Sequence, residues 1–161
     1  MDDSFLTEFR DTIEQAEGQL LEIPEVETEK PLAGGWTAKQ ILGHLIDSAA
    51  NNHARFVRAQ LQEDLVFEGY DQEAWVRVQR YNKEAWAALV DLWTEYNLHL
   101  LHVISNVPDA ILNEPRAKHS LDKIAWQTVP ASQPVTLDYF IRDYLGHMKD
   151  HLQQIFSGVT N

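Results

Sequence analysis

Three histidines are the residues of this sequence whose type and spacing could support chemistry. His147 and His151 lie four residues apart in the stretch YLGHMKDHLQQI, and His44 lies about a hundred residues earlier in WTAKQILGHLIDSAANN. On a helix, side chains four residues apart stack one turn above the other, so both imidazoles can reach a single ion. Whether His44 can join this pair therefore decides what chemistry the chain can perform.

The histidine pair falls on or beside the apolar face of an expected helix, residues 136–157, which Thr136 caps and Gly158 ends. Apolar residues recur there at intervals of three and four, the helical period. They are Leu137, Phe140, Ile141, Tyr144, Met148, Leu152 and Ile155. His151 lies on this face and His147 lies beside it, so we expect both imidazoles to point inward.

His44 has a comparable position in a second expected helix, residues 37–62. It lies at the edge of the apolar face, in a polar strip. The other members of the strip are Ser48, Asn51 and Arg55. A buried polar group without a hydrogen bond costs roughly 1–3 kcal/mol, and a bound ion with its waters would supply partners. Arg55 could bind an anionic group of a substrate or form a surface ion pair.

Three imidazoles around one ion would form a site of the catalytic kind, because three protein ligands leave a position open. Imidazoles without thiolates suit zinc, nickel, iron, manganese or cobalt. Asp47 and Asp143 each lie about one turn from a histidine and could orient an imidazole or serve as a general base. Both could also be surface carboxylates. Equally, the three histidines could be hydrogen-bonded residues at the edge of a metal-free core.

The other four histidines are weaker candidates. His53 lies on the side of its helix away from His44, and His99 and His102 are expected to face solvent. His119 lies in an irregular segment. We therefore expect none of them at the site.

Composition narrows the classes of function. The chain has 161 residues, which suits a single domain, residues 1–161, and it contains no cysteine, so any thiol chemistry needs an external thiol. A net charge of -12 without a basic cluster argues against nucleic acid as a partner. No apolar stretch is long enough for a transmembrane helix, and the acidic start MDDSFLTEFR does not resemble a secretory signal. We expect a soluble cytoplasmic protein.

Periodicity predicts an all-α four-helix bundle. The long helices are expected at residues 4–22, 37–62, 83–106 and 136–157. Residues 71–81 could be a short helix or an ordered loop, and residues 114–134 are irregular.

The tryptophans divide into core and loop positions. Trp86 and Trp93 lie seven residues apart on an apolar stripe, so both are expected in the core. Trp36 precedes a helix cap formed by Thr37 and Gln40 and is expected to pack at that end. Trp75 and Trp126 lie in less regular segments and could line a pocket.

Two motifs resemble the DinB superfamily, in particular its YfiT-like branch. The stretch GGWTAKQILGHLIDS is similar to the family pattern W-[ST]-x-x-[EQ]-x-x-x-H-[LV]-x-D-S, and the last helix carries its H-x-x-x-H. The matching residues are Trp36, Thr37, Gln40, His44, Asp47, Ser48, His147 and His151. Close relatives often read W-H-x-x-H-H in the last helix and H-H in the second. Gly43, Gly146 and Asp150 stand at those extra positions here.

The resemblance implies a four-helix bundle, often dimeric, whose three histidines bind a divalent metal, usually zinc or nickel. Family members have been described as proposed metal-dependent hydrolases, and some relatives are thiol S-transferases or isomerases that use bacillithiol or mycothiol. The leading hypothesis is therefore a metal-dependent hydrolase acting on a small molecule. The alternatives are a transferase with a low-molecular-weight thiol as partner, and a non-catalytic bundle that its ion stabilises.

Overall fold

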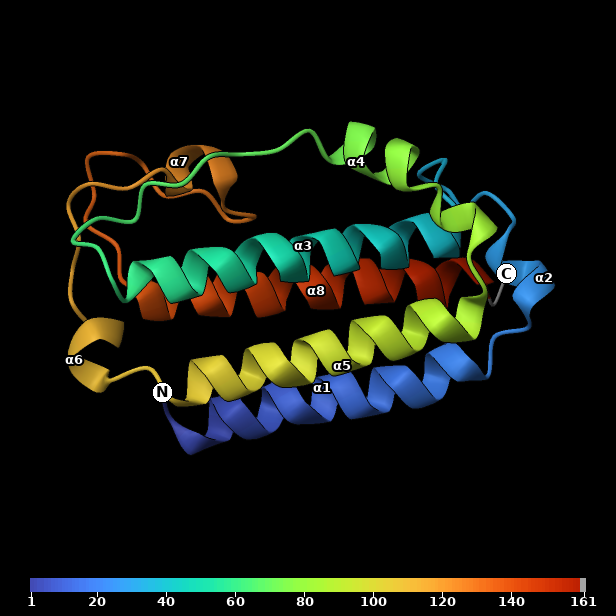
Figure 1. Cartoon of the computed structure of the whole chain (residues 1–161), viewed down its shortest axis with the longest axis horizontal. Coiled ribbons are helices and arrows are strands. Elements are labelled where there is room, and N and C mark those ends of the chain that lie inside the picture. Colours follow the sequence, from blue (N-terminus) through green and yellow to red (C-terminus); the bar gives the residue numbers. More distant parts are fainter. Residues whose placement is uncertain (160–161) are drawn as a thin grey trace.

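Four long helices run side by side in the computed structural model, which describes residues 1–159 (Figure 1). They are α1 (Asp3–Leu21), α3 (Ala38–Ala59), α5 (Trp86–Ser105) and α8 (Leu137–Val159). Shorter helices lie in the connections: α2 (Glu25–Thr28), α4 (Gln72–Gln79), the 3₁₀ helix η1 (Tyr81–Lys83), α6 (Asp109–Leu112) and α7 (Leu121–Ile124). The described residues form no strand beyond isolated bridges, so the predicted all-α four-helix bundle is confirmed.

The long helices pack in a fixed order. Helix α3 packs against both α5 and α8, and α1 packs mainly against α5. The connections from α3 to α5 and from α5 to α8 are long, and their parts around α4 and α7 lie along the side of α3 and α8 that faces away from α1 and α5 (Figure 1). This side of the bundle is where loop residues meet helix residues.

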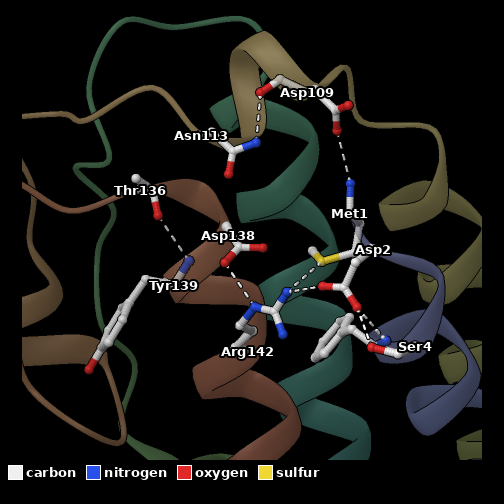
Figure 2. Close-up of polar contacts among 10 residues, drawn as sticks. Met1, Asp2, Ser4, Asp109, Asn113, Thr136, Asp138, Tyr139 and Arg142 are labelled. Atoms are coloured by element: carbon white, nitrogen blue, oxygen red, sulfur yellow. Dashed lines mark hydrogen bonds and ion pairs between the residues drawn. The ribbon is translucent and has the colours of Figure 1, made fainter.

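Side-chain caps fix the starts of three of the four long helices. Thr37 and Gln40 form the predicted capping box of α3, with Thr37 Oγ1 accepting from the Gln40 amide at 3.2 Å. Thr136 Oγ1 accepts from the Tyr139 amide at 3.1 Å, which confirms the predicted cap of α8 (Figure 2). Asp2 caps α1 in the same manner. Each such cap contributes roughly 1 kcal/mol.

Ion pairs join the start of α1 to α6 and α8 (Figure 2). The terminal amino group of Met1 lies 3.1 Å from Asp109. Arg142 on α8 bridges Asp2 at 2.5 Å and Asp138 at 2.8 Å. Exposed pairs of this kind contribute at most about 1 kcal/mol each, so they fix the position of the chain end more than they stabilise the bundle.

The core follows the predicted stripes. Trp86 and Trp93 are both buried, and the Trp86 indole donates to the Leu20 carbonyl at 2.7 Å. The seven apolar residues predicted to face inward from residues 136–157 are all buried. No helix among residues 1–159 combines the length and apolarity that crossing a bilayer requires.

Three helix boundaries differ from the prediction. Helix α3 ends at Ala59 instead of residue 62, because Arg116 donates to the carbonyls of Ala59 and Gln62 at 3.0 and 2.7 Å and holds the chain in a turn. Helix α5 begins at Trp86 because the preceding residues form η1. Helix α8 continues through Gly158, which was predicted to end it, and the Leu32 side chain occupies the space that a Cβ there would need.

Gly43 allows a close approach inside the bundle. A Cβ at this position would lie 2.1 Å from Cδ2 of Tyr81, so the tyrosine ring rests directly on the backbone of α3. The Tyr81 atoms nearest to the Cβ position belong to the rigid ring, and the ring is buried, so it cannot swing aside easily. A larger residue at 43 therefore has to displace the ring.

We predict that Gly43→Ala destabilises the protein by about 1–3 kcal/mol, the usual cost of overpacking. Gly18→Ala is the matched control, because Gly18 also lies within a helix and has no atom within 4 Å of its Cβ position. Removing that glycine should stabilise by roughly 0.5–1 kcal/mol. Urea unfolding of both variants measures the difference, and equal stability of the two would contradict the assigned contact.

Candidate metal centre

The three candidate histidines meet between α3 and α8. Nε2 of His44 lies 3.2 Å from Nε2 of His147, and one ring nitrogen from each of the three histidines lies within 4.8 Å of the others. The ring centroid of His151 lies 4.8 Å from that of His44 and 4.6 Å from that of His147. The i, i+4 pair and the distant histidine therefore form one cluster.

These spacings suit a shared cation. Zinc–nitrogen bonds of about 2.0–2.1 Å in a tetrahedral site put ligand nitrogens about 3.3 Å apart. The His44–His147 distance of 3.2 Å is close to that value. Two imidazole nitrogens at this distance either share a proton in a hydrogen bond or face a common ligand. The cluster is the single group of at least three His, Cys or acidic side chains with metal-ligand spacing among residues 1–159.

Burial keeps the imidazoles neutral. The pKa of His44 falls to about 4, mainly because the ring is buried and secondarily because His151 is close. The pKa of His147 falls to about 3 through burial and then through its two histidine neighbours. Burial also lowers the pKa of His151. Neutral imidazole is the form that binds metal, so near neutral pH the cluster needs no deprotonation before an ion binds.

Gln154 fixes the tautomer of His151. Nδ1 of His151 lies 3.2 Å from Oε1 of Gln154, and the Gln154 amide nitrogen donates to Asp150 at 2.8 Å. Because Oε1 is an acceptor, Nδ1 carries the proton and Nε2 keeps its lone pair for a ligand. Partners of this kind orient metal-binding histidines in proteins.

His44 has a buried nitrogen without a partner. Its side chain is 1% exposed, Trp36 packs against the ring with centroids 5.5 Å apart, and Nδ1 accepts or donates no hydrogen bond within residues 1–159. A fully satisfied core histidine would pair both nitrogens. Because Nε2 is the nitrogen that faces His147, Nδ1 has no partner within residues 1–159 whether or not Nε2 binds an ion.

Asp47 lies near the cluster but pairs with other residues. Its Oδ1 accepts from the Tyr81 hydroxyl at 2.7 Å and from the Gln79 amide at 2.5 Å. Burial raises the pKa of Asp47, although both hydrogen bonds oppose that shift. Oδ2 is buried and has no protein partner among residues 1–159. The carboxylate thus anchors η1 and α4 on α3, and no hydrogen bond joins it to an imidazole.

Asp143 holds a loop. Its two oxygens accept from the backbone amides of Trp126 and Gln127 at 2.9 and 2.7 Å. A Cβ on Gly146 would lie 2.8 Å from Cζ3 of Trp126, so the indole packs directly on α8. Asp143 is buried and not the surface carboxylate considered from the sequence. Both of its oxygens serve the loop instead of an imidazole.

A cavity of about 380 Å³ adjoins the cluster. His147 and His151 line it together with Ser48, Asn52, Arg55, Gly69, Tyr70, Gln72, Lys123, Ile124, Ala125, Trp126, Phe140, Asp143 and Tyr144. Trp126 therefore contributes to a pocket as the sequence suggested, whereas Trp75 packs on Tyr70 outside the cavity. The volume falls in the usual range for sites that bind small molecules.

The polar strip of α3 differs from the prediction at one position. Asn52, not Asn51, lines the cavity with Ser48 and Arg55. The Asn51 side chain instead donates to the Asp47 carbonyl of its own helix at 2.8 Å. The remaining histidines stay outside the cluster: His53 contacts Tyr96 and His99, and His102 is exposed. His119 is buried and bonded to backbone.

Sequence patterns missed several residues of the site. Tyr70, Gln79, Tyr81 and Lys123 lie in segments without clear periodicity, and nothing in the sequence pointed to them. Gln154 had a detectable signal, because a polar side chain three residues after His151 on the same helix can reach its ring.

Known proteins resemble this chain in sequence. Residues 8–155 match the family described as the DinB superfamily. "Putative metal-dependent hydrolase OB0782" of Oceanobacillus iheyensis is 29% identical over 125 residues, 78% of this chain and 66% of that protein. "Putative metal-dependent hydrolase YfiT" of Bacillus subtilis is 34% identical over 68 residues, 39% of this chain and 38% of that protein. The matches thus span slightly under two thirds of the first relative and less than half of the second.

A solved structure has the same fold. Its description reads "YfiT from Bacillus subtilis is a probable metal-dependent hydrolase with an unusual four-helix bundle topology". It superposes with a TM-score of 0.75 and 19% identity, over 98% of this chain and 87% of that one. At this identity the likeness establishes the bundle architecture.

We predict that metal-free protein, prepared with a chelator, loses stability as the pH falls from about 7 to 5. Unfolded His44 binds a proton near its ordinary pKa of 6.5, whereas folded His44 binds one only near 4. The unfolded state therefore gains more protons, and stability falls with pH. His44 accounts for a loss on the order of 2 kcal/mol over this range. In urea unfolding, His44→Gln should reduce this loss but not abolish it, because burial also lowers the pKa of His147 and of His151. The control His102→Gln, at an exposed position, should keep the wild-type pH dependence.

We predict that Asp143→Ala frees the backbone that its carboxylate holds. The amides of Trp126 and Gln127 lose their acceptors, so their hydrogen exchange should speed up by at least about tenfold. Metal content should stay at the wild-type level, because no histidine is removed. Asp138→Ala, an exposed ion-pair change on the same helix, is the control. Unchanged exchange at both amides would show that the loop does not depend on this carboxylate.

Proposed function

This chain belongs to the DinB superfamily, and from that premise we propose that it is a metal-dependent hydrolase of small molecules, with His44, His147 and His151 as ligands of one divalent cation. The observation that carries the proposal is the convergence of three neutral imidazoles beside a cavity that two of them line. The descriptions of two relatives as metal-dependent hydrolases support it.

Three protein ligands leave a position for substrate or water, the arrangement of catalytic zinc sites. A cation bound there would supply Lewis acidity, which activates water near neutral pH. The chain's own residues prepare the site: burial keeps His44 and His147 uncharged, and Gln154 directs Nε2 of His151 away from the helix surface. We propose zinc or nickel, since three imidazoles suit both.

The cavity also bears on the rival hypotheses. A bundle that its ion merely stabilises would enclose the ion completely, but here His147 and His151 face a space large enough for a substrate. A thiol S-transferase would use the same ion to activate a thiol from outside, because the 161 residues include no cysteine. Thiol transfer is therefore the second reaction that the assay below can detect.

The two carboxylates are proposed to act in different ways. Asp143 positions the Trp126 loop that forms one side of the cavity, and both of its oxygens are engaged. Asp47 has one free oxygen, Oδ2, one helical turn from His44. Of the two, Asp47 is the one with an oxygen left to accept a proton, and because Asp47 does not line the cavity, we propose that a water molecule connects it to the site.

We predict that His147→Ala and His151→Ala each reduce bound metal from one ion per chain to background and lower kcat/KM by at least about 100-fold. Metal content is measured by mass spectrometry after dialysis, and turnover with panels of esters and amides, with and without an added low-molecular-weight thiol. Hydrolysis without thiol supports the proposal, whereas turnover only with thiol and an electrophile supports the transferase. His102→Ala, at an exposed position, is the control.

Background metal in the wild-type protein after reconstitution with zinc or nickel would contradict the proposal. Full metal occupancy without turnover in any panel would favour the non-catalytic bundle.

A further inference from the structure

Arg55 is a buried cation whose protein partners are all neutral. The residue is 7% exposed, and its guanidinium donates to Oδ1 of Asn52 at 3.3 Å and to the carbonyl of Glu68 at 2.8 Å. No carboxylate forms an ion pair with it among residues 1–159. Because a guanidinium has five N–H groups, donors remain for a further acceptor.

The other buried lysine and arginine side chains of the described residues have acidic partners. Lys39 lies 2.8 Å from Glu25 and 3.0 Å from Glu29, and Arg116 lies 3.6 Å from Glu114. Removing a charge from water costs several kcal/mol unless an opposite charge offsets it. The chain contains 25 acidic residues, so carboxylates are abundant. Arg55 is the exception, which indicates that its counter-charge comes from outside the protein.

Arg55 faces the cavity that adjoins the histidine cluster, since both Arg55 and His147 line it. Tyr70 lines the same cavity, and no hydrogen bond ties its hydroxyl to residues 1–159. Asp143 is the one carboxylate among the lining residues, and backbone amides occupy both of its oxygens. Arg55 and Lys123 are the two cationic side chains of the lining, and both can donate to an anion.

The position of Arg55 along α3 limits the shape of such a ligand. Eleven residues separate it from His44, a rise of roughly 16 Å at about 1.5 Å per residue, and the two side chains shorten that distance. A ligand that reaches both places therefore carries its anionic group several atoms away from the bond that reacts at the histidines. The cavity of about 380 Å³ admits a small molecule of this kind.

We infer that Arg55 and Tyr70 bind an anionic group of the substrate, a carboxylate or a phosphate, while the bond to be cleaved lies at the three histidines. The inference rests on the function proposed above and narrows it: the substrates are small esters or amides that carry a negative charge at the end away from the reacting bond. Arg55 and Tyr70 act as binding residues that determine specificity.

The binding experiment uses inorganic phosphate and glutarate as probes, titrated into chelator-treated protein by calorimetry. Without metal, the histidine cluster offers no cation for these anions. Wild-type protein should bind at least one probe, and Arg55→Gln should weaken its binding by at least about tenfold. Arg58→Gln is the matched control, because Arg58 lies on the same helix, is exposed, and packs over Phe67 outside the cavity. Its affinity should equal that of wild type.

Two further variants keep the experiment decisive. Arg55→Lys retains the charge and should recover part of the affinity. Tyr70→Phe removes a hydroxyl without a protein partner, so it should fold normally and weaken binding by about three- to tenfold. If neither probe binds wild-type protein, or if Arg55→Gln and Tyr70→Phe both bind as wild type does, the inference is wrong.

Metal content separates this inference from the proposed function. Arg55→Gln should keep one ion per chain, and His147→Ala should lose the ion yet still bind the probe. Metal binding without anion binding would overturn only the anion site, whereas anion binding without metal would overturn only the hydrolase. In the ester panel, Arg55→Gln should raise KM for carboxylate-bearing esters by at least about tenfold and leave KM for neutral esters unchanged.

Discussion

The packing of α3 against α8 is the constraint on which the site depends. His44 is the only one of the three ligand candidates on α3, and its Nε2 lies 3.2 Å from that of His147 across the helix pair. A one-residue rotation of either helix would turn an imidazole by about 100° and separate the nitrogens. The apolar faces of both helices are buried on the same core, which prevents that rotation. The geometry of the histidine cluster is therefore a product of the hydrophobic register, not of the histidines alone.

Glycines bring the loops to this helix pair. At Gly43 and Gly146 the space of a side chain is taken by the rings of Tyr81 and Trp126, which come from the connections. Asp143 holds the loop that carries Trp126, because its oxygens accept from the amides of Trp126 and Gln127. Both rings come from segments that are distant in sequence from the helix on which they rest.

Periodicity predicted the bundle and the inward direction of the histidines, because these depend on local repeats of three, four and seven residues, and residue type predicted the caps. It could not predict that Arg116 ends α3 or that Tyr81 pairs with Asp47, since both contacts join segments far apart in the chain. Asn51 and Asn52 illustrate the intermediate case. They point about 100° apart on α3, and Asn52 borders the cavity together with Gly69 and Tyr70, whereas Asn51 bonds to the Asp47 carbonyl.

Some elements of the fold line the cavity, and others support the core beneath it. Its residues come from α3, α8 and the connections around α4 and α7, and none comes from α1 or α5. Helices α1 and α5 support the core that sets the register of α3 and α8, and α5 also reaches the lining through Asn97, whose Oδ1 accepts from the Tyr144 hydroxyl at 2.6 Å. The connections contribute Tyr70, Lys123 and Trp126 without supplying a ligand. It follows that a chain with the same four helices but different connections would keep the histidine cluster and line the cavity beside it with other residues.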